Sequence, residues 1–279
     1  NDRVIGYTSI TYDFSDKLSL LVRSAIDSST RGKESKFYND SYIIADNGNY
    51  TTNNSRSLEW NNDFLLTYNG NISDNVTMNL NLGGNNRVNK GQGLSTSNNV
   101  LNAPNIFALS NAQNLTAGQS ISDREVNSLY AFGNFGFGNA VFLDATYRSD
   151  WSSTLPSDNN RYDYYSLGVS SVLSDVIQFP EFINYFKVRG SIAEVGNDTD
   201  PYRLERLARL EPGGFISLDP TAPASDLRPE KTTSSELGFE TTLFNQAVTI
   251  DFTYYKSNSV DQLFRQNVPS ASGISSEGD

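Results

Sequence analysis

The chain contains no cysteine and no histidine among its 279 residues. Without cysteine it forms neither a disulfide framework nor a thiolate metal site, which excludes the small disulfide-stapled secreted class. Without histidine it lacks the usual general base and the commonest metal ligand. Ser-His-Asp and Cys-His triads, HExxH zinc sites and histidine-dependent proteases are therefore excluded. The sequence predicts no catalytic residue, no metal site and no cofactor.

Long apolar runs are also missing. Only 37% of the residues are apolar, and no stretch approaches the ~18 consecutive apolar residues that a membrane helix needs. The aromatic content is high, with 15 Tyr and 16 Phe. A formal net charge of −11 argues against a nucleic-acid partner, which requires a clustered basic face. The acidic balance is typical of solvated loops.

What the sequence does contain is a repeated alternation of apolar and polar side chains. From Val76 to Leu82, every second residue is apolar and the residues between them are all polar, which suits a strand between lipid and water. Gly138 and Asn139 separate two such segments and form a hairpin signal, because both tolerate positive φ. In total we predict ten strands in five hairpins, at 4–14 and 18–26, 58–68 and 76–82, 129–137 and 141–147, 165–173 and 186–192, and 237–243 and 248–254.

The connections alternate between short and long. Polar loops are predicted at 28–57, 83–127 and 195–232, whereas the turns inside the pairs are short; the turn at 174–185 is unusually apolar and could hold a short helix. In the third loop, residues from Pro201 to Leu210 fit a helix or an extended segment equally well. Short turns at one end and long loops at the other predict an all-β, antiparallel transmembrane β-barrel with periplasmic short turns. Soluble β-sandwiches and β-helices also alternate, but seldom with such long loops at every second connection.

A resemblance to a known family rests on two groups of motifs. The first group runs from Arg148, Asp150 and Ser152 through Asn160-Arg161-Tyr162 to Lys187, Arg189 and Gly196-Asn197; the second is Pro229-Glu230-Lys231, which leads into a strand. In this order they resemble the SusC/RagA family of TonB-linked (TonB-dependent) outer-membrane transporters. The sequence departs from the family at Trp151, where a small residue is common, and at Tyr164-Tyr165, where Phe-Pro is frequent.

The resemblance implies active import of oligosaccharides or peptides through the outer membrane of a Gram-negative, Bacteroidetes-like cell. It implies energy from the TonB complex, a SusD-like surface lipoprotein acting as a lid, and contact with outer-membrane lipid. The family's barrel has about 22 strands around a plug. Residues 1–279 are therefore expected to be part of the barrel domain, with the plug, the TonB-contacting segment and the C-terminal strands outside this chain.

Trp151, Arg161, Tyr162 and Tyr164 are the candidate ligand-binding residues. Aromatic faces stack on sugar faces, but with Tyr165 they also fit an aromatic girdle at the lipid headgroups. The Arg148, Asp150 and Arg161 group fits a salt-bridged rim network as well as a ligand site. The residues expected to be structural are the family-motif positions Arg148, Asp150, Ser152, Lys187, Arg189, Gly196, Asn197, Pro229, Glu230 and Lys231. Asp198 and Asp200 carry the oxygen ligands that calcium uses, but their spacing matches no EF-hand and indicates a solvated loop.

Two other function classes remain open from the residues alone. Ten strands could close on themselves, since an open sheet leaves unpaired backbone groups in hydrocarbon at several kcal/mol each. Such a closed barrel could act as an adhesin or receptor, or as an omptin-like membrane enzyme, although omptin activity depends on a histidine. Glu236 and Glu240 share one strand face, but four residues span ~13 Å, which is too far for a retaining glycosidase pair.

Overall fold

The computed structural model describes residues 1–279 except 43–46, 99, 211–212, 224–226, 264, 270, 272–273, 275 and 279. Its main element is an antiparallel sheet of ten strands in the order β1-β2-β3-β4-β5-β6-β7-β8-β12-β13. The strands are β1 (Asp2–Ser15), β2 (Leu18–Phe37), β3 (Asn49–Ser73), β4 (Val76–Asn98), β5 (Leu115–Phe137), β6 (Val141–Ser152), β7 (Arg161–Val172), β8 (Ile183–Asn197), β12 (Glu230–Leu243) and β13 (Val248–Val260). The ten strands and five hairpins that the alternation predicts are confirmed.

Smaller elements lie in the connections. A 3-10 helix, η1 (Leu109–Asn111), lies between β4 and β5, and two small sheets involve β9 (Ala208–Leu210) with β10 (Ile216–Leu218), and β11 (Thr221–Ala222) with β14 (Arg265–Asn267) and β15 (Ser276–Gly278). The short segment after Pro201 is therefore a turn followed by a strand rather than a helix. In the part of the chain that the structure describes, no helix has the length and apolar character needed to cross a membrane.

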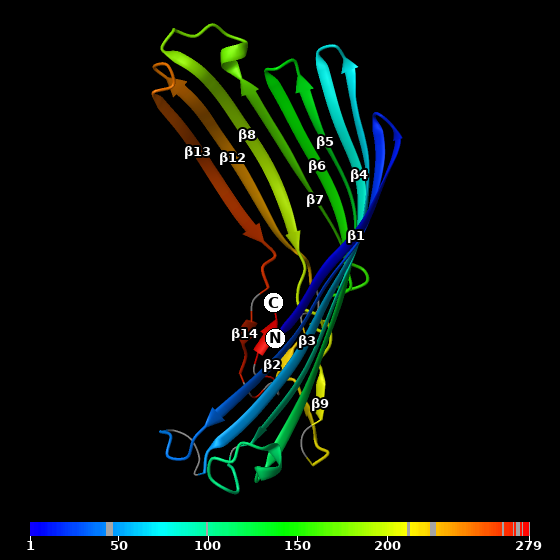
Figure 1. Cartoon of the computed structure of the whole chain (residues 1–279), viewed down its shortest axis with the longest axis vertical. Helices are drawn as coiled ribbons and strands as arrows, with labels where there is room; N and C mark the ends of the chain where they lie inside the picture. Colours follow the sequence, from blue (N-terminus) through cyan, green and yellow to red (C-terminus); the bar gives the residue numbers. More distant parts are fainter. Residues whose placement is uncertain are drawn as a thin grey trace.

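The five short turns gather at one end of the sheet, which is the top of Figure 1. Gly138 in the β5–β6 turn has a φ of +57°, whereas the φ of Asn139 is not positive, so the turn uses the conformational freedom of the glycine alone. The apolar connection between β7 and β8 begins with the 3-10 helix η2 (Leu173–Asp175), so the short helix expected there is present. The β2–β3 and β4–β5 connections lie at the opposite end, at the bottom of Figure 1. This arrangement separates a short-turn end from a long-loop end.

The predicted polar loops at 28–57 and 83–127 are wrong in their extent. β2 and β3 continue to Phe37 and from Asn49, and β4 and β5 continue to Asn98 and from Leu115, so most of both segments is strand. Apolar alternation is needed only where one face meets an apolar phase. Beyond that zone the strands pair through hydroxyl groups, as in the Thr52–Thr96 contact of 2.5 Å and the Ser97–Thr116 contact of 2.9 Å.

The sheet is open. Within the described residues, β1 pairs only with β2 and β13 only with β12, and these two edge strands are almost entirely exposed. The alternative of a closed ten-stranded barrel is therefore wrong for this chain. Figure 1 shows the two edge strands, β1 and β13, apart from each other rather than paired.

The two faces of the sheet differ in chemistry near the short turns. Register places the apolar residues of neighbouring strands on one face: Leu66 is opposite Leu82, Leu82 is opposite Ala131, and Ala145 is opposite Leu167. Val169 and Leu167 expose 50% and 46% of their surface, so nothing in the described chain covers them. We call this side the apolar face. Its apolar band comprises Leu18, Leu20, Val22, Phe64, Leu66, Tyr68, Met78, Leu80, Leu82, Ala131, Gly133, Phe135, Leu143, Ala145, Tyr147, Tyr165, Leu167 and Val169.

The opposite side, the polar face, carries a ladder of carboxamides and hydroxyls. The Asn85 side chain donates to the Asn61 side chain at 2.6 Å, and Asn81 accepts from the Thr67 hydroxyl at 2.7 Å. Asn89 donates to Glu59 at 2.8 Å. A strand with one apolar and one polar face is the arrangement of a transmembrane barrel whose interior is aqueous.

Candidate functional site

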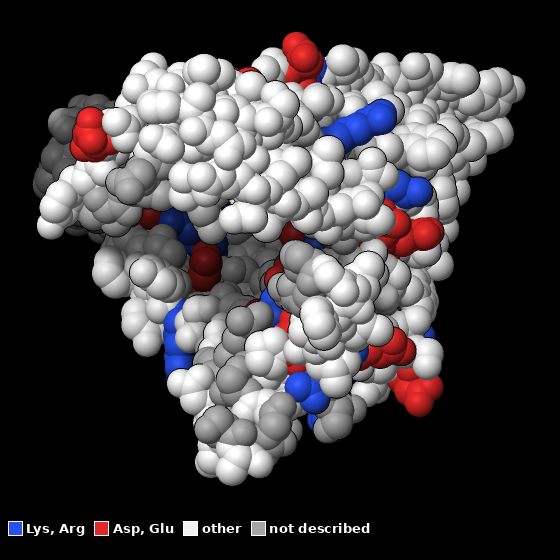
Figure 2. Space-filling view, turned by 90° about the horizontal axis from the view of Figure 1, so that it is seen from below, with Lys and Arg blue, Asp and Glu red and all other residues white. Residues whose placement is uncertain are grey.

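The candidate site lies on the polar face, where β5, β6 and β7 run beyond the apolar band toward the long-loop end. Register brings Tyr130, Arg148 and Tyr164 into one row and Ser128, Asp150 and Tyr162 into the next. This face is hollowed at the long-loop end, and acidic and basic side chains lie together in the hollow (Figure 2).

Asp150 is the centre of the first network. Its side chain is 7% exposed and accepts from Arg148 Nε at 2.8 Å and from the Tyr164 hydroxyl at 2.8 Å. Arg148 Nη2 also donates to Ser128 Oγ at 2.8 Å, and its guanidinium lies 5.4 Å from the centre of the Tyr130 ring. Both oxygens of the buried Asp150 carboxylate therefore have a donor, and the network links side chains of three adjacent strands.

Asp198 is the centre of the second network. Its side chain is 1% exposed, and it accepts from Nε and Nη2 of Arg124 on β5. It also accepts from Ser152 at the end of β6 and from Thr154 in the loop that follows. The solvated loop expected at this position is wrong for Asp198, because the loop after β8 folds back over the polar face. Asp200 does lie in an exposed position, where it pairs with Arg203 at 3.2 Å.

A small apolar cluster joins the two networks. Leu155, Tyr162 and Leu227 are each at most 6% exposed, and Tyr164 and Leu204 pack against them. The three buried residues come from the β6–β7 loop, β7 and the segment before β12. Tyr162 lies outside the apolar band, which ends at Tyr165 on β7. Burial, together with the nearby Asp198 and Asp150 carboxylates, raises the pKa of Tyr162 to about 12.

Gly196 supports this cluster through its lack of a side chain. A Cβ atom at this position would lie 2.5 Å from the Tyr162 ring. We expect Gly196→Ala to destabilise the long-loop end by about 1–3 kcal/mol, because the ring must leave its packed position. Thermal unfolding of the full-length protein in detergent measures this loss.

The matched control is Gly190→Ala on the same strand, where the nearest atoms to an added Cβ are 3.8 Å away. Its expected effect is small. Equal losses for the two variants would show that loss of glycine from β8, rather than contact with Tyr162, sets the stability.

The four candidate ligand residues do not share a face. Tyr162 and Tyr164 point to the polar face. Trp151 and Arg161 are register partners on the apolar face, the same face as the partners Tyr147 and Tyr165. The Arg161 guanidinium lies 5.4 Å from the Trp151 ring centre and pairs with Asp163 at 3.0 Å. Arg161 is therefore separate from the Arg148 and Asp150 network with which the sequence grouped it.

The remaining family-motif residues lie along β8 and β12. Arg189 on the polar face pairs with Asp251 at 2.6 Å, and Lys187 lines the same small polar depression. Lys231 lies 3.4 Å from Glu194, Asn197 is the register partner of Glu230, and the Glu230 carboxylate accepts from the Leu263 backbone. Pro229 directly precedes β12. These residues connect neighbouring strands.

Sequence reasoning assigned no site role to Arg124, Leu155 or Leu227. All three lie inside segments that were read as polar loops or short connections. A signal existed for Arg124, since Arg124, Val126 and Ser128 have the spacing of one strand face, but the segment lacks apolar alternation.

Comparisons with known proteins agree with this geometry. The family model "TonB dependent receptor-like, beta-barrel" matches residues 1–276. TonB-dependent receptor P26 of Formosa agariphila is 27% identical over 165 residues, which cover 55% of this chain and 16% of that protein. TonB-dependent receptor P3 of the same organism is 25% identical over 171 residues, which cover 56% of this chain and 17% of that protein. The chain thus spans about a sixth of the length of these curated relatives.

Solved structures show the same fold. The RagAB peptide transporter matches with a TM-score of 0.84 and 19% identity over 99% of this chain and 32% of that chain. The siderophore receptor PiuA from Acinetobacter baumannii matches with a TM-score of 0.58 and 13% identity, over 99% of this chain and 42% of that one.

Proposed function

We propose that this chain, which belongs to the TonB dependent receptor-like β-barrel family, forms part of the wall of an outer-membrane importer for oligosaccharides or peptides. The observation that supports the proposal is the two-faced sheet, because its apolar band suits contact with lipid and its polar face suits an aqueous lumen. Further strands of the full-length protein, to a total of about 22, would pair with the open edges of β1 and β13.

The polar face has the chemistry to contact a polar cargo. It presents carboxamides, hydroxyls and arginine side chains rather than a charge of one sign. Arg148 is one donor on this face that a ligand oxygen can reach, since its side chain is 35% exposed. Sugar hydroxyls and peptide carbonyls both offer such acceptors. No covalent chemistry is required of these residues.

Import would draw energy from the TonB complex through a segment outside residues 1–279, and a SusD-like surface lipoprotein would cover the long-loop end. The experiment is uptake by cells that carry or lack the full-length gene, with fluorescent peptides and oligosaccharides offered separately. We expect one cargo class to accumulate only in cells with both the gene and an intact TonB complex. Accumulation that is independent of TonB would contradict active import.

The assignment of the two faces is tested by a lysine placed on either face of β7. Val169→Lys introduces a charge at an apolar-face position that is 50% exposed. We expect it to lower the free energy of unfolding in lipid by about 2–4 kcal/mol, because the charge enters hydrocarbon. Urea titration in vesicles provides the measurement.

Ser170→Lys is the control, since the next residue points to the polar face. Its expected change is within about 1 kcal/mol, because the charge stays in water. A larger loss for Ser170→Lys than for Val169→Lys would reverse the assignment of lipid and lumen faces.

A further inference from the structure

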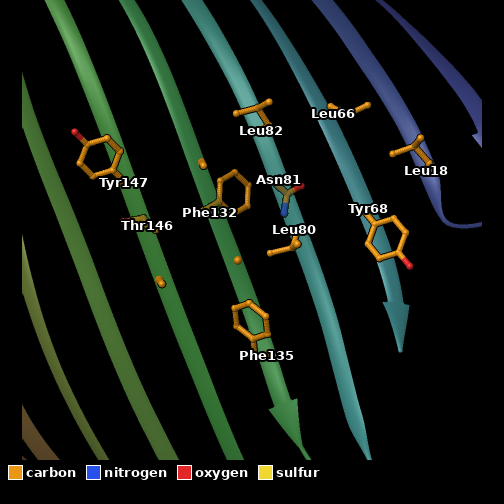
Figure 3. A pocket seen from close by; sticks show the side chains of 13 residues that line it. Leu18, Leu66, Tyr68, Leu80, Asn81, Leu82, Phe132, Phe135, Thr146 and Tyr147 are labelled. Atoms are coloured by element: carbon orange, nitrogen blue, oxygen red, sulfur yellow. The ribbon is translucent and has the colours of Figure 1, made fainter. Parts of the chain in front are cut away.

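A groove with a volume of about 490 Å³ crosses the apolar band from β2 to β6. Figure 3 shows the larger side chains around it, among them Leu80, Leu82, Phe135 and Tyr147. Ala131 and Ala145 also line it and leave room between these side chains, whereas Leu80 lies over Gly133, where an added Cβ would be 2.8 Å from Leu80 Cδ2.

Strand register produces the groove. Gly133 lies between its partners Leu80 on β4 and Ala145 on β6, and Ala131 lies between Leu82 and Tyr147. Large residues on β4 therefore stand beside small residues on β5. Ten of the thirteen lining residues belong to the apolar band, and Asn81, Phe132 and Thr146 complete the lining. Because most of the lining is apolar-face residues, the groove opens toward the hydrocarbon of the bilayer rather than toward water.

A cationic group lies beside the end of this groove. Tyr147, which lines the groove, is four residues before Trp151 on β6, and Trp151 is the register partner of Arg161. The Arg161 guanidinium stacks on Trp151 and contacts Asp163 at 3.0 Å and Ser149 Oγ at 3.3 Å, yet its side chain remains 53% exposed. Arg161 is on the long-loop side of the band, where the outward-facing residues become polar.

We propose that the groove and Arg161 together hold one phosphate-bearing lipid of the outer leaflet, of the lipid A type. An acyl chain lies over Ala131 and Ala145, and the phosphate contacts the exposed part of the Arg161 guanidinium. Arginine suits this contact, because its planar fork binds phosphate with two donors and because Asp163 occupies only one edge of that fork. Trp151 and Tyr147 lie at the height of the headgroups, where aromatic rings are favoured. The proposal rests on the outer-membrane placement given under the proposed function.

The test is native mass spectrometry of the full-length protein after delipidation in detergent and incubation with lipid A. We expect one lipid A to remain bound to the unmodified protein. Arg161→Gln removes the cation, and a double change of Ala131→Leu with Ala145→Leu fills the groove while keeping it apolar. Each is expected to reduce the retained lipid at least tenfold, whereas Val169→Leu, outside the groove, leaves it unchanged.

Separate arms distinguish the sources of phosphate. Phosphatidylglycerol retained as well as lipid A, or release of lipid A by millimolar inorganic phosphate, would overturn the commitment to an outer-leaflet lipid. Equal retention by the groove-filled and unmodified proteins would overturn the site. Insertion into vesicles is measured in parallel by heat-dependent electrophoretic mobility. Insertion without retention of lipid A rejects only this inference. Failure to insert rejects the membrane placement itself.

Discussion

Replacing Arg124 with alanine is expected to destabilise the long-loop end by about 3–5 kcal/mol, the cost of leaving a buried carboxylate without its partner. The partner is Asp198, whose side chain is 1% exposed and which ties the loop after β8 to β5 and to the end of β6. Two hydroxyl donors, from Ser152 and Thr154, remain after the change, but they carry no charge. The Asp198 carboxylate is then left in its buried site without a cation.

Hydrogen exchange of the full-length protein measures where this loss occurs. We expect faster exchange in residues 198–204 and at the end of β6, with little change near the short turns. Arg3→Ala is the matched control, because the Arg3–Asp27 pair has the same residue types but side chains that are 62% and 36% exposed. An exposed pair contributes about 0–1 kcal/mol. The same loss in both variants would show that burial does not set the value of the Arg124–Asp198 pair.

The double change Arg124→Met with Asp198→Leu separates pairing from burial. Removing both charges leaves no unpaired group, so the double variant is expected to be more stable than either single variant. If the stability lost in the double variant equalled the sum of the losses in the two single variants, the two side chains would not be coupled.

The sequence predicted the membrane-facing half of the fold well because lipid imposes a strict period. A strand with hydrocarbon on one side must present an apolar residue at every second position, so Val76 to Leu82 could be assigned from the pattern alone. Outside the bilayer this requirement ends. In the outer part of β4, from Asn85 to Asn98, only Val88 and Leu94 have apolar side chains, so the apolar alternation is lost. The pairing of this part with β5 depends on long-range register that no local pattern predicts.

The candidate site was predicted in part for a related reason. Arg148 and Asp150 are two residues apart, so strand period alone places them on one face, and their ion pair follows. Arg161 is one residue from Tyr162, and the same period places them on opposite faces. The Asp198 network joins residues 74 positions apart in the chain. Such a contact depends on how the loop folds back over the sheet, and neither composition nor spacing determines that path.

Tyr162→Ala is the second change with a large expected effect. The ring is 6% exposed and packs with Leu155 and Leu227, so truncation leaves a cavity under two loops. We expect a loss of about 3–5 kcal/mol in the free energy of unfolding. Tyr165→Ala, on the apolar face and 44% exposed, is the control and is expected to lose much less. Thermal unfolding in detergent compares the two.

Tyr162→Phe tests whether the ring or the hydroxyl provides this stability. Phe keeps the packing, so below pH 10 the stability of Tyr162→Phe should stay close to that of the unmodified protein.

Tyr162 has a pKa of about 12 in the folded protein and an ordinary value near 10 when unfolded. The unfolded state therefore releases its proton first, and the contribution of Tyr162 to stability is complete below pH 10 and is lost as the pH rises through 12. Tyr162→Phe should lack this loss. A decline of equal size between pH 10 and 12 in both proteins would assign the pH dependence to other tyrosines, and a large loss in Tyr162→Phe at neutral pH would show that the hydroxyl, rather than the packed ring, holds the two loops on the polar face.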